Sequence, residues 1–219
     1  MEFNREWNYN LKEKLNTLKQ QWGELLQKPE HQKTRIKDAA DILNVSEAEL
    51  LSTTIGENTY FLNIQDWAQI FKHISSLGLM MYLIRNNYAV HENTISIDRM
   101  TYERDNIILS NKNSTICVTP SLIEYAFYTS AIIRGDKIYS IHLFDSYGVA
   151  IMKIYLKNNH LKQFEMIKNK YTKEYNFELQ QLKTSNDSEQ SKKIIKNTLT
   201  ALPIDTDFSI QQYLEEVLY

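Results

Sequence analysis

The sequence predicts an α+β protein in which N-terminal helices pack on a large antiparallel β-sheet and a helical extension follows at the C-terminus. Three observations predict this class. Residues 4–28 repeat apolar side chains at helical spacing, residues 79–156 carry a series of apolar or alternating runs, and residues 160–171 return to the helical pattern. Because turn residues rather than helices separate most of the runs, the strands are expected to pair as antiparallel hairpins.

The composition limits the class of protein. The chain has 219 residues, is 42% hydrophobic and 24% charged, and carries a net charge of −2. These values are typical of a globular protein, and they give no electrostatic case for binding nucleic acid or an anionic membrane. No apolar run approaches the ~18 residues of a membrane span, and the first residues lack the apolar segment of a secretion signal. A cytoplasmic location is therefore expected.

Two short helices are expected after the first long one, in the segment RIKDAADILNVSEAELLST (residues 35–53). Asn44 is suited to end the first of them, and Ser46 with Glu49 forms a capping box that opens the second. The pair resembles a helix-turn-helix, but its second helix is acidic where DNA phosphates need cations. Packing is therefore favoured over DNA binding, which stays a weaker alternative.

After these helices the chain is expected to form a short strand, a further helix and then the strands of the sheet. A short strand at 60–64 precedes a helix at 66–76 that Asp66 caps. The segment after Pro120 is expected to begin with a helical turn and to continue as a strand. The predicted strands of the sheet are 79–84, 88–97, 100–109, 114–118, 122–133, 138–144 and 149–156.

The C-terminal part is expected to be helical and polar. Residues 160–171 place apolar side chains on one helix face, residues 172–200 read as a polar connector, and residues 208–219 fit a final amphipathic helix.

The stretch Leu79–Glu92 is where a functional group first stands out. An apolar run ends at Ile84, a polar group begins at Arg85, and the chain then reaches His91. An imidazole at the end of a strand, beside a cation and a carboxylate, fits a ligand held at a pocket wall. It fits an ordinary edge residue equally well, so the residues alone leave both interpretations open.

Several common kinds of site are excluded by their motifs. The chain has no HExxH zinc motif, no glycine-rich phosphate loop and no GxSxG nucleophile elbow. Its single cysteine, Cys117, excludes an intrachain disulfide and a cysteine-rich metal site. Because Cys117 lies within a strand pattern, a buried inert thiol is expected rather than a nucleophile.

The sequence resembles the hemin-degrading factor (HemS/ChuX) family in three blocks: RIKDAADILNVSEAELLST at 35–53, RNNYAVHE at 85–92 and LFDSYGVAIMKIYL at 143–156. The blocks, and the helix that starts at Asp66-Trp67, occur in the same order as in the family. The resemblance implies that residues 1–171 form one HemS/ChuX-like haem-utilisation module. Residues 172–219 then correspond to a linker-like helical extension.

What the resemblance implies about function is a cytoplasmic haem-binding protein of haem uptake and iron utilisation. Such a protein either carries haem or degrades it to release iron, so enzymatic activity stays open. Haem is the implied cofactor, an electron donor is an expected partner of the degrading version, and a homodimer is a further expectation for a single module. The alternative is a non-enzymatic interaction or regulatory protein that keeps the fold and has lost haem binding.

The resemblance also suggests site residues, since haem needs an apolar cleft, an axial donor and cations for its propionates. His91 is the expected iron ligand. Arg104, or less favourably Arg99, is expected on the next hairpin strand, facing the same cleft. Arg85 and Lys153 are further candidates for the propionates. The competing interpretation makes His91 a structural residue and the arginines solvated strand charges.

The sequence departs from the family pattern at two places; Met152, at the first, fits core packing or a weak thioether ligand, and the missing histidine at the second favours the alternative function. The histidine of the family's last block is Met152 here. The iron-ligating histidine near the end of the linker corresponds to the region of Asp207, which contains no histidine.

Overall fold

The computed structural model describes residues 3–86, 88–133, 135–157 and 159–172. Its helices are α1 (Phe3–Gln27), α2 (Ile36–Leu43), α3 (Glu47–Ser52), α4 (Trp67–Ser76) and α5 (Leu161–Tyr171), with single 3₁₀ turns at Pro29–His31 and Pro120–Leu122. Its strands are β1 (Thr59–Phe61), β2 (Met80–Arg85), β3 (Val90–Ile95), β4 (Arg99–Glu103), β5 (Asn106–Asn111), β6 (Ser114–Val118), β7 (Tyr125–Ile133), β8 (Asp136–Phe144) and β9 (Ala150–Leu156). The predicted α+β class is confirmed.

The strands form two antiparallel sheets where the sequence predicted one. The larger sheet has the order β1-β7-β8-β9-β2-β3, and the smaller sheet has the order β4-β5-β6. The run predicted as one strand at 100–109 breaks at Arg104, which adopts a positive φ of 51°, and continues as β5. The prediction that the arginine strand forms a hairpin with β3 is therefore wrong, because β4 pairs with β5.

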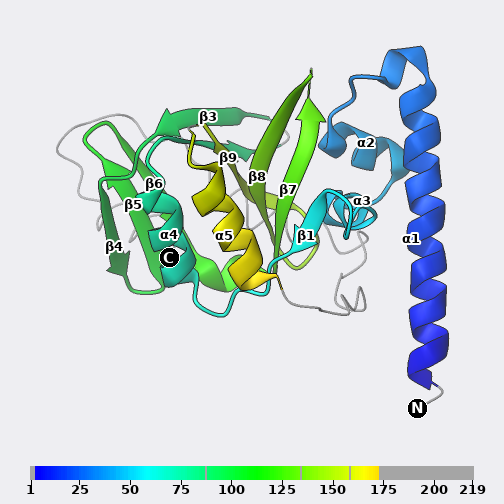
Figure 1. The fold of residues 1–219 in the computed structure, drawn as a ribbon, viewed down its shortest axis with the longest axis horizontal. Coiled ribbons are helices and arrows are strands. Elements are labelled where there is room, and N and C mark those ends of the chain that lie inside the picture. Colours follow the sequence, from blue (N-terminus) through cyan, green and yellow to red (C-terminus); the bar gives the residue numbers. More distant parts are fainter. Residues whose placement is uncertain (1–2, 87, 134, 158, 173–219) are drawn as a thin grey trace.

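The main core lies on one face of the larger sheet. Figure 1 shows α4 and α5 on this side of the molecule, and the smaller sheet closes the same core. Helix side chains such as Phe71 and Phe164 are fully buried there against Tyr82, Tyr128 and Ile154 of the sheet. This face carries the main core, and we call it the core face.

The N-terminal helices cover part of the opposite face. Ala48 and Leu51 of α3 pack against Phe127 and Phe144 of the sheet. Helix α1 lies outermost (Figure 1) and packs Leu18 and Leu25 against apolar side chains of α2 and α3. The predicted packing of N-terminal helices on a large sheet is confirmed.

Local sequence signals set the ends of these helices as predicted. Asn44 takes a left-handed conformation with φ 53° and ends α2. Ser46 and Glu49 form the predicted capping box, with Ser46 Oγ accepting from the Glu49 amide and Glu49 Oε2 accepting from the Ser46 amide at 2.9 Å. Asp66 caps α4 by accepting a hydrogen bond from the Gln69 amide at 2.9 Å. These caps satisfy amides that the helices leave unpaired.

One glycine fixes how closely α3 approaches the sheet. Gly148, in the turn between β8 and β9, has a φ of +74°, and a Cβ built there would lie 2.4 Å from Ser46 Oγ. The carbonyl of Gly148 accepts a hydrogen bond from the Ala48 amide at 3.2 Å. The turn and the start of α3 therefore meet backbone to backbone, and no side chain fits between them.

Gly148→Ala is expected to lower the free energy of unfolding by about 2 kcal/mol, because left-handed strain and the clash with Ser46 add. Gly135→Ala is the matched control, since Gly135 also has a positive φ of +90° but nothing lies within 4 Å of its added Cβ. The control is expected to cost about 1 kcal/mol from strain alone. Urea denaturation of both variants measures the difference, and equal losses would refute the close approach.

Two further expectations concern Cys117 and the C-terminus. Cys117 is exposed in β6, so the prediction of a buried thiol is wrong. Its strand buries the alternate side chains Ile116 and Val118 instead. The expected connector, final helix and Asp207 region fall within residues 173–219, outside the described residues.

Candidate functional site

The face of the larger sheet opposite the core face carries polar side chains, and we call its part on β8, β9, β2 and β3 the polar face. The strand register places its side chains in cross-strand rows. The members are Ser140 and His142 of β8, Lys153 and Tyr155 of β9, Met81, Leu83 and Arg85 of β2, and Val90, Glu92 and Thr94 of β3. Burial falls from β8, which is covered, to β3, which is exposed.

A buried ion pair joins the polar face to the helical layer. Lys153 Nζ donates to Glu47 Oε1, and the two side chains are only 6% and 5% exposed. Glu47 is the first residue of α3, so the capping box and the contact at Gly148 position its carboxylate. Each charge has lost most of its water, and the partner compensates for that loss. Neither charge can be removed alone at low cost.

His142 lies beside this pair and is held neutral. Its Nε2 lies 2.9 Å from Ser140 Oγ, which in turn lies 2.8 Å from Thr129 Oγ1. Its Nδ1 is buried without a hydrogen-bond partner. Burial, and then the charge of Lys153, lowers the pKa of His142 well below its ordinary value. The imidazole therefore stays uncharged at neutral pH.

Arg85 has unused hydrogen-bonding capacity. Its Nη2 lies 3.8 Å from Asp38 Oδ1, an ion-pair distance that is too long for a hydrogen bond. Its Nε is buried and has no hydrogen-bond partner. The side chain is 18% exposed, so an anion arriving from solvent can reach it. This guanidinium is the best-prepared anion contact among the predicted residues.

Tyr155 places a phenol in the middle of the polar face. Its ring lies 6.0 Å from that of His142, and the residue is half-buried. Burial raises the pKa of Tyr155 to about 12, with Glu47 and Glu92 acting in the same direction and Arg85 acting against them. The charge of Arg85 therefore acts on the Tyr155 phenol, although the two residues lie on different strands.

The predicted iron ligand lies on the other side of the sheet. His91 pairs with Ile84, which packs against the main core, whereas the neighbouring pair Arg85 and Val90 belongs to the polar face. His91 itself is exposed near the end of the edge strand β3. Because side chains alternate along a strand, His91 and Arg85 cannot face one planar ligand lying flat on the same side.

The two other predicted arginines belong to the smaller sheet. Arg99 opens β4, and Arg104 lies in the turn between β4 and β5; both are exposed. A hydrogen bond from Asn93 Nδ2 to Ser114 Oγ, 2.8 Å long, ties β3 to this sheet on the side that His91 occupies. The structure thus brings Arg85 and Lys153 to one face and leaves His91, Arg99 and Arg104 off it.

Sequence reasoning missed His142, Tyr155 and Glu47. His142 and Tyr155 lie in strands whose alternate side chains were predicted to face the core. Because side chains alternate along a strand, the sequence could have predicted that both residues point to the opposite face. Glu47 was harder to predict. A carboxylate at the N-terminus of a helix is stabilised by the helix dipole, so the sequence gives no reason to expect a distant cation as its partner.

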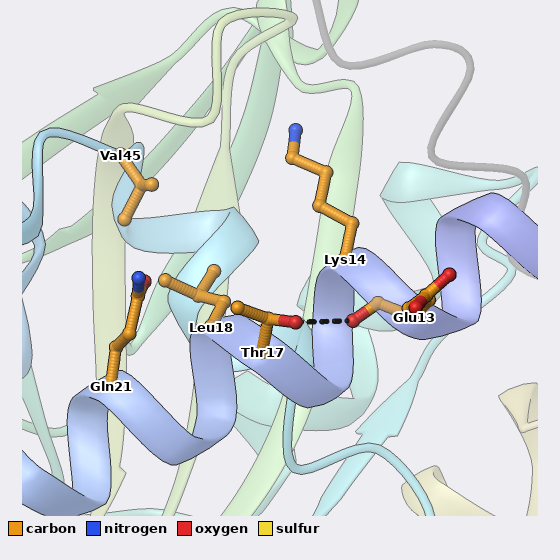
Figure 2. Close-up of a pocket in the computed structure, with 6 residues that line it drawn as sticks. All are labelled: Glu13, Lys14, Thr17, Leu18, Gln21 and Val45. Carbon is orange, nitrogen blue, oxygen red and sulfur yellow. Dashed lines mark hydrogen bonds between the residues drawn. The ribbon is translucent and has the colours of Figure 1, made fainter.

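A surface groove lies away from these residues. It has a volume of about 400 Å³ and runs along α1 beside the α2–α3 turn, as Figure 2 shows. Its lining is Glu13, Lys14, Thr17, Leu18, Gln21 and Val45. Along α1, Thr17 Oγ1 donates a hydrogen bond to the backbone carbonyl of Glu13. None of the predicted site residues lines this groove.

The described part of the chain contains no group of three or more His, Cys, Asp or Glu side chains arranged to hold a metal ion. Within the same residues, no helix is both long and apolar enough to cross a membrane.

Comparison with known proteins identifies the family. The chain is 28% identical over 138 residues to hemin transport protein HmuS of Yersinia pestis, covering 59% of this chain and 37% of that protein. The fold matches holo-PhuS, a heme-binding protein from Pseudomonas aeruginosa, with TM-score 0.66 and 24% identity over 73% of this chain and 46% of that one. It also matches ChuS, a heme degrading enzyme of Escherichia coli O157:H7, with TM-score 0.72 and 19% identity over 92% of this chain and 59% of that one.

The chain therefore spans less than two thirds of the length of each of these relatives. The model of the haemin-degrading HemS/ChuX domain matches residues 44–171, from the end of α2 to the end of α5. This match includes more than half of the chain, both sheets and the polar face. The chain belongs to the haemin-degrading HemS/ChuX domain family.

Proposed function

We propose that this protein binds haem in the cytoplasm and serves haem utilisation. The observation that carries the proposal is the match of residues 44–171 to the haemin-degrading domain. The names of the relatives agree with it, since HmuS is a hemin transport protein and PhuS a heme-binding protein. Bound haem would supply a redox-active iron; everything else at the site must come from the chain.

The polar face offers two of the groups that haem needs, apolar contacts and a cation. Leu83, Met81 and Val90 offer apolar contacts at its half-buried and exposed end. Arg85 offers charged donors that no side chain of the described chain fully uses, which suits a propionate. Lys153 suits a propionate less well, because a propionate would have to displace Glu47 from a buried pair.

A second arrangement places haem against the edge of the sheet. His91 would then bind the iron from the core-face side, and Arg99 or Arg104 of the smaller sheet would serve the propionates. The two arrangements differ in which cations bind the propionates.

Hemin titration of the full chain is expected to produce a perturbed Soret band that saturates at micromolar ligand. Arg85→Gln is expected to weaken binding about tenfold, because a charge-assisted contact to a propionate is lost. The loss should vanish with hemin dimethyl ester, whose propionates are blocked. Lys137→Gln, which removes an exposed cation at the far end of β8, is the matched control. Larger losses in His91→Ala and Arg104→Gln would favour the edge arrangement, and no band at all would refute haem binding.

The same haem complex can be used to distinguish carriage of haem from its degradation. Reductant and oxygen should bleach the Soret band if the protein degrades haem with an electron donor, and should leave it intact if the protein only carries haem. Light scattering of the same sample tests the proposed homodimer.

The second candidate is an interaction or regulatory protein that keeps the fold without haem. It is favoured by the division of the predicted residues between two faces, with His91 on one and Arg85 on the other. It predicts self-association or partner binding with an unchanged hemin spectrum.

A further inference from the structure

We propose that Tyr155 is the iron ligand on the polar face, its phenolate oxygen binding ferric haem while Arg85 pairs with a propionate. This inference rests on the proposed function, and it assigns an iron ligand that the family resemblance did not suggest. It begins from the placement of His91 on the opposite face of the sheet. A haem whose propionate reaches Arg85 must take its donor from the polar face.

Few side chains of the polar face can donate an axial ligand to haem iron. Haem proteins use imidazole, thiolate, thioether or phenolate as axial ligands, and carboxylate is not among the usual ones. His142 is 6% exposed, and its Nε2 is already bonded to Ser140. Met81 is a neutral thioether, which matches ferric iron poorly. Tyr155 is half-buried, and among the described residues its hydroxyl is not tied up in a hydrogen bond.

The register puts the phenol at a suitable separation from Arg85. Tyr155 pairs with Met81, and Arg85 lies four residues farther along β2, so the two Cα rows are about 13 Å apart. Both side chains are long and rise from the same face. Leu83 lies between the two rows and offers an apolar surface for the macrocycle.

The surroundings of Tyr155 keep its phenol protonated in the free protein, so it would lose its proton only when it binds iron. Burial, and then Glu47 and Glu92, raise the pKa of Tyr155 and disfavour a free phenolate, whereas Arg85 favours one. Lys153 is neutralised by Glu47 and adds little net charge. When the iron–oxygen bond forms, the phenol O–H bond breaks and its proton passes to solvent; no electron is transferred. The ferric charge then compensates the phenolate.

The test compares Tyr155→Phe with the wild-type full chain in hemin titrations and resonance Raman spectra of the ferric complex. The wild-type complex is expected to display vibrational modes of an iron-bound phenolate. Tyr155→Phe keeps the ring beside His142 but is expected to lose these modes and to bind hemin at least tenfold more weakly. Tyr139→Phe is the matched control, because Tyr139 is one row from Tyr155 on the core-face side of β8, and it should change neither readout. Circular dichroism checks that each variant folds.

Each result decides between the proposals. Wild-type spectra without phenolate modes, together with unchanged binding by Tyr155→Phe, overturn the assignment of Tyr155 and leave haem binding standing. Loss of binding in His91→Ala but not in Tyr155→Phe does the same and moves the ligand to His91. A wild-type chain that does not perturb the hemin spectrum overturns haem binding and Tyr155 together.

Discussion

Lys153→Met is expected to lower the free energy of unfolding by about 3–5 kcal/mol. The substitution removes the charge that faces Glu47 and leaves a buried carboxylate without its cation. Methionine fills similar volume, so the loss reports the unpaired charge rather than a cavity. Urea denaturation at neutral pH measures it.

A second substitution separates pairing from packing. In Lys153→Met/Glu47→Met both charges are absent, and most of the lost stability is expected to return, because buried pairs often add little over apolar residues. The surface pair of Lys14 with Glu49 is the matched control; Lys14 is 64% exposed, and Lys14→Met should cost less than about 1 kcal/mol. A double variant as unstable as the single one would contradict the argument.

The second large effect is a loss of stability in acid that depends on His142. The pKa of buried His142 lies well below 6.5, its ordinary value in an unfolded chain. Below about pH 6.5 the unfolded chain therefore binds a proton that the folded chain does not. Stability falls as pH falls, by about 1.4 kcal/mol per pH unit, until the folded pKa is reached.

His142→Gln removes the titrating group and keeps a polar side chain that can bond Ser140. The free energies of unfolding of wild type and variant, measured between about pH 7 and about pH 5, are expected to converge as pH falls. Other titrating groups, including Asp145, whose pKa burial raises, are common to both proteins and cancel in the comparison. Parallel curves would indicate that the pKa of His142 is the same in the folded and the unfolded protein.

The sequence predicted most of the elements because local chemistry decides them. The period of 3.6 marked α4 and α5, and the caps at Ser46 and Asp66 gave two helix starts. The division into two sheets was not accessible, since it depends on whether β4 pairs with β3 or only with β5. That choice is made by packing of the smaller sheet against the core, and alternation alone does not encode it.

The candidate site was predicted less well for a related reason. Arg85 and Lys153 were chosen for their charge, and the register does bring them to one face. His91 was chosen for its imidazole, but its position one residue from Val90 and Glu92 places it on the other face. Glu47 lies 106 residues from Lys153, so no local pattern connects them.

That separation has a consequence for synthesis on the ribosome. The residues of α3 and its capping box are synthesised before those of β9. Glu47 and the apolar side of α3 therefore leave the ribosome before their partners in the sheet. The turn at Gly148 and then Lys153 are among the last parts of the module to emerge. Helix α3 therefore cannot bury Ala48 and Leu51 before Phe127 and Phe144 have been made, and Glu47 cannot be paired before Lys153 has been made.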